Sequence, residues 1–354
     1  MPHPKASQFG ANRAEETFGG HAAPGADRVG LNTEPALALA AVFTPVFIPV
    51  VTPALNARKP QFSRHASLGD ITAAVLQCCL DQVNGNASAV AAGSVDAEHI
   101  HQLRVGLRRL RTALRALGPL SEGIDPAWDA PLAAVSRRLG YHRDQSQLAL
   151  CLNLCVEAAG GPMLDTRLNA DAPAAADGTH TPAEAVRSHA FQQALRGIAS
   201  CALALQRELV AADGQHQHQH QHDQRKQAKR QLLGLLNRLH TQTLAAGKKF
   251  PTLDLARQHQ ARKRLKQLRY LAEFLAPLFS ARRVDAFVAG LKPAQDALGQ
   301  YHDELVALEA YRRVAPADPR AWFGVGWLTA RQGMHVRLCQ KELQAAAQRK
   351  PFWH

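Results

Sequence analysis

The chain has 354 residues, with 42 lysines and arginines against 29 aspartates and glutamates, and a formal net charge of +13 at pH 7. This length suits one large domain or two smaller ones, and the charge indicates a polyanionic partner: polyphosphate, nucleic acid or an anionic membrane surface. Aromatic residues make up only 6% of the chain, which argues against a protein that holds single-stranded nucleic acid mainly by stacking its bases.

An amino-terminal arm precedes the regular part of the chain. Residues 1–62 contain scattered Gly, Pro, Asn and Thr without helical periodicity, so we expect them to be disordered. Residues 35–57 carry no charge and are long enough to span a membrane, but Pro45, Pro49 and Pro53 would each remove a hydrogen bond from such a helix. We therefore expect no membrane span. The apolar segment is either an extended stretch that docks onto a partner or a tail, including one translated from a start codon placed too far upstream.

From Leu68 onward the spacing of apolar residues predicts helices. The second helix has a cap at Asp96 and a stop at Gly118-Pro119, and Pro182 opens the fourth. A polar, Ala- and Pro-rich stretch at residues 161–182 is expected to be a long loop. The four helices of this first half are expected over residues 68–85, 97–117, 126–160 and 182–213.

Four more helices are expected after a tract of alternating Gln and His at residues 214–224. The tract is either a low-complexity linker or an adventitious site for Zn²⁺, Ni²⁺ or Cu²⁺, which imidazole binds. The helices that follow are expected over residues 225–246, 252–275, 282–314 and 320–349, the third of them spanning Pro293. Because no segment requires a strand, the sequence predicts an all-α fold.

The helix expected at residues 97–117 carries two parallel stripes, since residues three and four apart share a helix face. One stripe is apolar and requires a core: Ile100, Leu103, Leu107, Leu110, Leu114 and Leu117. The other, one position further on, is cationic: His101, Arg104, Arg108, Arg111 and Arg115. No acidic residue interrupts the cationic stripe, so its repulsion must be relieved either by acids on a neighbouring helix or by an anion from outside.

The same pattern returns 158 residues later without a gap. His101 corresponds to His259, Arg104 to Arg262, Leu107 to Leu265, Arg108 to Lys266, Leu110 to Leu268 and Arg111 to Arg269, while Glu273 replaces Arg115. A second element follows each copy, namely Leu139-Gly140 with Asp144 and Leu298-Gly299 with Asp303. We interpret the chain as a duplicated helical unit.

These two elements, occurring twice in a basic helical chain, resemble those of the CHAD family, the conserved histidine α-helical domain. The resemblance covers residues 67–349 and is better in the first copy. It implies two four-helix bundles related by a pseudo-twofold, with basic residues lining a central groove or pore. It also implies binding of inorganic polyphosphate, often on polyphosphate granules, without catalytic activity. The chain is then divided into an arm at 1–62, a first CHAD half at 63–213, a His/Gln-rich linker at 214–224 and a second CHAD half at 225–354.

Arginine suits such a ligand because its planar fork matches phosphate oxygens and keeps its charge. Cations that recur every three or four residues step roughly 5 Å along the helix axis, so a row of them can follow a chain of phosphates. The candidate polyphosphate-binding residues are His101, Arg104, Arg108, Arg111, Arg115, Arg137, Arg138, Arg143, His259, Arg262, Lys263, Lys266 and Arg269. The two histidines either donate to phosphate or position the arginines. Asp144 and Asp303 are interpreted as acids that either orient a nearby Arg or His or satisfy a helix terminus across the interface.

No phosphate-binding glycine loop, nucleophile elbow or His-Glu-x-x-His motif is found, so we expect no enzymatic activity, no cofactor and no metal site. The alternative to polyphosphate is sequence-nonspecific nucleic acid, bound through the same basic surface. A further hypothesis is a structural partner protein that docks through the apolar arm.

The six cysteines include no C-x-x-C pair, so we expect reduced, mostly buried thiols in a reducing cytoplasm. For Cys151 and Cys155, a disulfide or metal role is the alternative. The expected location is the cytoplasm, on polyphosphate granules, with granule-associated proteins as possible additional partners.

Overall fold

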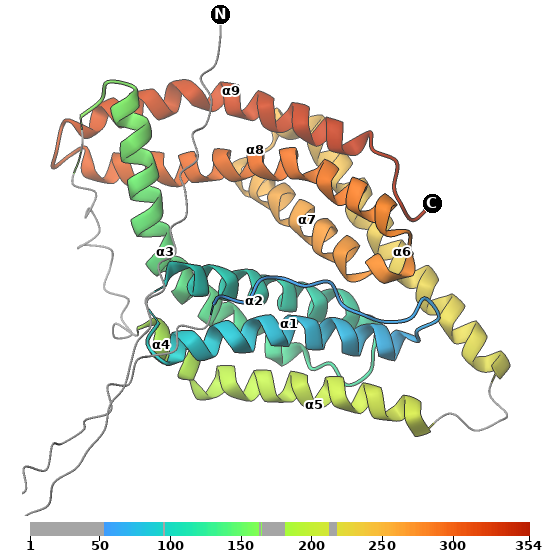
Figure 1. Ribbon diagram of the computed structural model, residues 1–354. Helices are drawn as coiled ribbons and strands as arrows, with labels where there is room; N and C mark the ends of the chain where they lie inside the picture. The colour runs from blue at the N-terminus through green and yellow to red at the C-terminus, as the bar shows by residue number, and fades with distance from the viewer. Residues whose placement is uncertain (1–52, 95, 163, 165–180, 212–217) are drawn as a thin grey trace, which may run out of the picture. The chain divides into compact units, whose positions relative to one another are not determined.

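The computed structural model describes residues 53–94, 96–162, 164, 181–211 and 218–354, and the side chains of these residues apart from 141–155, 208–211 and 218–224. The predictions for the arm up to residue 52, for most of the 161–182 loop and for residues 212–217 lie outside this part of the chain. The all-α prediction is confirmed, because the described residues form helices and connecting segments without a strand (Figure 1). Among these helices, none combines the length and apolar character that crossing a membrane requires.

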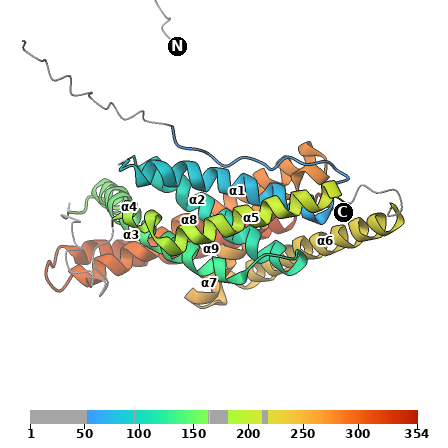
Figure 2. The ribbon, with the colours of Figure 1, turned by 90° about the horizontal axis from the view of Figure 1, so that it is seen from below.

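The first group of helices is built around α1 (Leu68–Ala91) and α2 (Ala97–Leu117). α5 (His189–Ala211) lies along α1 in both views (Figure 1, Figure 2), and α4 (Pro182–Arg187) packs on α1 and α3. The predicted fourth helix is therefore two helices, separated at Ser188. α3 (Asp129–Ala158) begins against α2 and α5 and also contacts α8 of the second group, so it connects the two groups. The 3₁₀ turns η1 (Gly118–Leu120) and η2 (Pro126–Trp128) lie between α2 and α3.

The second group contains α6 (His218–Lys249), α7 (Leu255–Phe274), α8 (Ala281–Val314) and α9 (Ala321–Ala347). α9 packs along α8, and α6 contacts both α7 and α9. The 3₁₀ turns η3 (Phe250–Thr252) and η4 (Ala276–Leu278) flank α7. One boundary differs from the prediction, because α6 begins inside the Gln/His tract, whereas α8 spans Pro293 as predicted.

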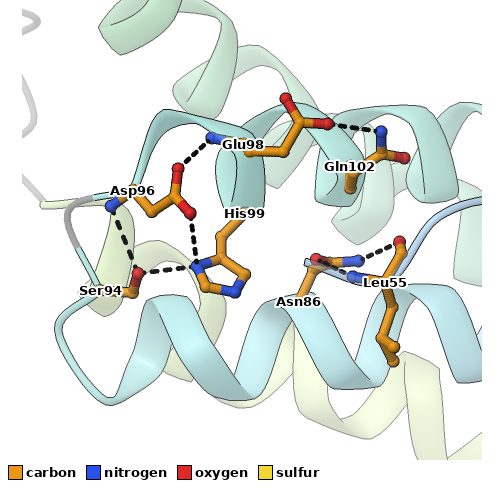
Figure 3. Close-up of polar contacts among 7 residues, drawn as sticks. All are labelled: Leu55, Asn86, Ser94, Asp96, Glu98, His99 and Gln102. Atoms are coloured by element: carbon orange, nitrogen blue, oxygen red, sulfur yellow. Dashed lines mark hydrogen bonds and ion pairs between the residues drawn. The ribbon is translucent and has the colours of Figure 1, made fainter. Parts of the chain in front are cut away.

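The first helix is longer than predicted, because Gly85 lies inside α1 instead of ending it. A Cβ at Gly85 would overlap the side chain of Leu55, so the glycine makes room for the segment that precedes α1. The Asn86 side chain holds the same segment by accepting from the Leu55 N–H at 3.1 Å and donating to the Leu55 carbonyl at 2.9 Å (Figure 3). The chain leaves α1 at Gly93, whose φ of 89° favours glycine.

The start of α2 is determined by polar contacts at its first turn (Figure 3). The Asp96 carboxylate accepts the N–H of Glu98 at 2.8 Å, as the sequence predicted for a cap. The Glu98 carboxylate accepts from the Gln102 amide at 2.7 Å, and the buried His99 Nδ1 lies 2.8 Å from the Ser94 hydroxyl. These contacts help to set which residue begins the helix.

The predicted apolar stripe forms part of the core. Leu103, Leu107 and Leu110 are fully buried, and so are their counterparts Leu265 and Leu268 in α7. These side chains belong to one hydrophobic cluster that includes residues from both groups of helices. Because α2 packs against α7, the two copies of the motif contribute to the same core. The pseudo-twofold relation and the central groove stay predictions.

Candidate basic site between α2 and α7

Cations of the two rows act on each other where α2 packs against α7. The pKa of Lys266 is lowered to about 7, first by burial of its ammonium group and then by the charges of Arg108, Arg262 and Arg269, while Asp303 opposes this effect. Arg108 comes from α2 and Lys266 from α7, and both are half-buried. The fold thus concentrates like charges from both copies in one place, and we call Arg108, Arg262, Lys266 and Arg269 the basic cluster.

The carboxyl-terminal end of the α2 row has an acidic partner on a neighbouring helix. Asp129, the first residue of α3, accepts from the Arg111 Nε at 2.9 Å and from an Arg115 Nη at 2.7 Å. Burial raises the pKa of Asp129, but the hydrogen bonds and charges of the two arginines outweigh it, so the net pKa is lowered. Arg111 and Arg115 are therefore engaged in ion pairs, and a phosphate ligand would have to compete with Asp129 for them.

Two further cations of the rows are hydrogen-bonded within the protein. Arg104 donates to the carbonyl of Gly140 at 3.5 Å, and this glycine belongs to the Leu-Gly element that follows the first copy. Arg269 donates to Glu273 and to Gln295, both at 2.8 Å. Glu273 occupies the position of Arg115 in the second copy, so both rows end in a carboxylate contact.

The amino-terminal end of the α7 row borders a pocket. The rings of His259 in α7 and His302 in α8 lie 5.1 Å apart between centroids, at 34° to each other. Both line a pocket of ≈ 540 Å³, together with Arg262. The pKa of His259 is lowered by burial and by the neighbouring charges of Lys263, Arg262 and Lys266, so in the ligand-free protein this imidazole is neutral at pH 7.

Comparison with known proteins agrees with this architecture. The sequence pattern of the CHAD domain family matches residues 74–312, which is more than half of the chain. The chain belongs to the CHAD family. The crystal structure of the CHAD domain from the plant Ricinus communis has a similar fold, with a TM-score of 0.61 and 23% sequence identity, over 82% of this chain and 96% of that one. No functionally curated protein matches this CHAD chain.

The other predicted site residues of the CHAD domain are placed as follows. Arg137, Arg138 and Lys263 are exposed, and His101 is half-buried on α2. Arg143 and Asp144 lie among the side chains outside the described part, so their predicted roles are not placed. Asp303 is exposed on α8, and its charge favours protonated Lys266, while its predicted role of orienting an Arg or His stays a prediction.

Sequence reasoning missed Arg109, which the structure assigns to the core of the CHAD domain. Its side chain is 1% exposed, donates to the Gln82 Oε1 at 3.0 Å and to the Arg58 carbonyl at 2.6 Å, and lies over the Phe274 ring at 5.4 Å. The sequence could have indicated this, because Arg109 follows Arg108 by one residue and is therefore rotated by about 100° from the cationic row around the helix. Asp129 was also missed, although an acid in the first turn of the next helix was visible in the sequence.

Within the described residues, no group of three or more His, Cys, Asp or Glu side chains is arranged to hold a metal ion. Cys78, Cys79, Cys201 and Cys339 are free thiols. Burial raises the pKa of Cys79 and of Cys339 to about 12, so both remain protonated at neutral pH. The side chains of Cys151 and Cys155 lie outside the described part, and the alternatives for that pair stay open.

Proposed function

We propose that this CHAD domain binds inorganic polyphosphate, without catalysis, along the α2 and α7 rows and with the basic cluster at its centre. The observation that supports this most is the proximity of Arg108 to Lys266, at equivalent positions of the two copies. Burial and like charge together lower the pKa of Lys266 to about 7, which shows that protonating this group in the folded protein is costly. An anion bound there would relieve both effects.

A slender ligand fits the proposal better than a nucleic-acid duplex does. Arg108 and Lys266 are half-buried between two packed helices, where a single chain of phosphates can approach more closely than a wide duplex. Phosphates repeated along one chain also match cations repeated along two helices. The exposed Arg137, Arg138 and Lys263 would contact the same ligand further out.

Binding of long-chain polyphosphate and of duplex DNA, at equal phosphate concentration and two salt concentrations, tests the proposal. The test variant is Arg108→Gln with Lys266→Gln. The matched control is Lys229→Gln with Arg230→Gln, which removes one lysine and one arginine from exposed positions of α6. We expect the test variant to lose about tenfold in polyphosphate affinity per position, because a hydrogen bond to a charged group contributes about 1.5 kcal/mol, close to a factor of ten.

The control variant should bind polyphosphate nearly as well as the parent, with only the loss expected from net charge. Equal loss in both variants would mean that general charge, not the basic cluster, holds the ligand. Preference of the parent for DNA would favour the alternative, nonspecific nucleic-acid binding, over polyphosphate.

We also propose that the protein resides in the cytoplasm on polyphosphate granules. A fluorescent fusion of the parent should overlap with stained granules, and the fusion that carries Arg108→Gln with Lys266→Gln should spread through the cell.

The absence of catalysis is tested by incubating the protein with polyphosphate and measuring released phosphate, which should stay at the level of a protein-free sample. Phosphate release that depends on the basic cluster would instead mean that the site is catalytic.

A further inference from the structure

The pocket at the end of the α7 row has a mainly apolar lining. Its volume of ≈ 540 Å³ is within the range of small-molecule sites, about 300–1,000 Å³. The apolar lining comes from the first turns of α7 and the middle of α8: Leu255, Ala256, Leu298, Tyr301, Leu305 and Val306. Inorganic polyphosphate offers nothing apolar to such a surface, so the proposed function leaves this pocket unexplained.

One side of the pocket is held in place by buried hydrogen bonds. The Tyr301 hydroxyl donates to the Gln258 Oε1 at 2.9 Å, and the Gln258 amide donates to the Phe250 carbonyl at 3.1 Å. Tyr301 and Gln258 are both buried. Two other lining residues are largely open to solvent, since Leu255 is 61% exposed and Val306 is 39% exposed. Large apolar side chains exposed together around a cavity are typical of a ligand-binding surface.

The polar groups of the lining define the ligand further. His259 and His302 contribute two imidazole rings, which are surfaces on which planar heterocycles stack. Arg262 lines the pocket and also belongs to the basic cluster, and Lys266 follows it by one helical turn. The carboxylate of Glu309 adds a hydrogen-bond acceptor, which suits a ligand with N–H donors. The pocket therefore matches a planar heterocycle with N–H groups and an attached chain of phosphates.

We propose that the pocket binds the base of a nucleoside polyphosphate whose phosphates lie along Arg262 and Lys266. This inference rests on the proposed function, because the phosphates would use part of the polyphosphate row. A nucleoside polyphosphate would then compete with the polymer for the α7 half of the site. An alkyl phosphate, another anion with an apolar part, would leave the Glu309 acceptor and the stacking surface of the two imidazoles unused.

Titration calorimetry with ATP, inorganic tripolyphosphate, dodecyl phosphate and long-chain polyphosphate, in magnesium-free buffer, tests this proposal. ATP and tripolyphosphate carry the same number of phosphates, so their difference reports on the base. We expect ATP to bind about tenfold more tightly than tripolyphosphate, the size of effect that stacking of one base produces. ATP that binds no more tightly than tripolyphosphate, or dodecyl phosphate that binds more tightly than ATP, would overturn the inference.

A pocket-filling variant makes the test specific. Ala256→Trp places a large side chain at an exposed position of the lining, and Ala289→Trp places the same side chain at an exposed position of α8 outside the pocket. Ala256→Trp should reduce ATP affinity to that of tripolyphosphate and leave tripolyphosphate unchanged, whereas Ala289→Trp should change neither. Unchanged ATP binding in Ala256→Trp would contradict the inference.

The same titrations separate this inference from the proposed function. If long-chain polyphosphate and tripolyphosphate both bind and ATP binds no more tightly, the proposed base-binding role of the pocket is rejected. Polyphosphate binding, the proposed function, then still stands. Failure of the parent to bind either inorganic ligand would remove the proposed function itself. Thermal melting of each variant confirms that the comparison is made between folded proteins.

Discussion

Arg108 of α2 and Lys266 of α7 stand at equivalent positions of the two copies of one motif, and the charge of Arg108 helps burial to lower the pKa of Lys266 to about 7. The packing of α2 against α7 therefore brings like charges together. Such a contact opposes folding. Neutralising either residue should consequently affect stability and binding in opposite directions.

Arg108→Gln should stabilise the fold by about 0.5 kcal/mol, the order of a like-charge pair on helices, while it weakens polyphosphate binding. Urea denaturation followed by circular dichroism measures the free energy of unfolding. Arg104→Gln is the control, because it removes a cation that donates to the Gly140 carbonyl and so should give no gain in stability. A loss of stability in Arg108→Gln would show that Arg108 has a structural role.

The affinity for polyphosphate should fall as the pH rises from 6 to 9. Lys266, with a pKa of about 7 in the free protein, loses its charge over this range, while the internal phosphates of the ligand stay ionised. A bound anion raises that pKa, so binding takes up protons. Lys266→Arg keeps its charge throughout and should show a much shallower dependence. Identical pH profiles for Lys266→Arg and the parent would exclude Lys266 as the titrating group.

Stability should change with pH in the opposite direction. The folded pKa of Lys266 is about 7, below its usual value of 10.5, so between these values the unfolded chain binds more protons than the folded protein. The free energy of unfolding contributed by this group therefore rises with pH in that window and is smallest below pH 7. Denaturation at pH 6 and pH 9 should show the difference in the parent and less of it in Lys266→Arg.

Asp129→Asn should release Arg111 and Arg115, which both donate to this carboxylate. We expect polyphosphate affinity to rise severalfold and the free energy of unfolding to fall by about 0.5–1 kcal/mol, the usual contribution of partly exposed ion pairs. Because the pKa of Asp129 is lowered in the folded protein, this contribution is present above about pH 4 and is lost as the pH falls. Exposed Glu122→Gln, with the same change in net charge, is the control for the binding titration. An equal gain in Glu122→Gln would attribute the effect to net charge alone.

Arg109→Met should destabilise the protein strongly, in contrast to Arg108→Gln. It leaves the buried Gln82 Oε1 without its donor from Arg109, at a cost of about 1–3 kcal/mol, and it also removes the hydrogen bond to the carbonyl of the exposed Arg58. Polyphosphate affinity of the remaining folded protein should be close to that of the parent apart from the lost charge. Denaturation combined with a binding titration thus distinguishes the structural role of Arg109 from the binding role of Arg108. Selective loss of binding in Arg109→Met, with normal stability, would reverse the assignment.

Leu107→Asp should prevent stable folding, because Leu107 is fully buried and an unpaired carboxylate in the core costs at least several kcal/mol. Natural domains have only about 5–15 kcal/mol of stability. The control is Leu203→Asp, at a position that is 51% exposed on α5 and should fold normally. A cooperative unfolding transition of parental stability in Leu107→Asp would contradict the burial of this stripe.

The sequence alone determined the all-α fold, the apolar stripe of α2 and the repeated motif that indicated the CHAD family, because periodicity and spacing are properties of neighbouring residues in one chain. It also placed the Asp96 cap correctly, while it ended α1 too early at Gly85, whose lack of a side chain serves packing by Leu55. It did not separate α4 from α5. The sequence identified the cations of the row as one set of candidate ligand-binding residues, and it did not distinguish their individual roles.

Only the tertiary structure decided what each cation does. Asp129 pairs with Arg111 and Arg115 because α3 begins beside the end of α2, and Arg108 approaches Lys266 because α2 packs against α7. Arg109 is buried and Arg108 is half-buried, since a rotation of about 100° on one helix changes how far a side chain is enclosed once a second helix is in place. Electrostatic interactions depend on distances between side chains of different helices, and those distances exist only in the folded protein.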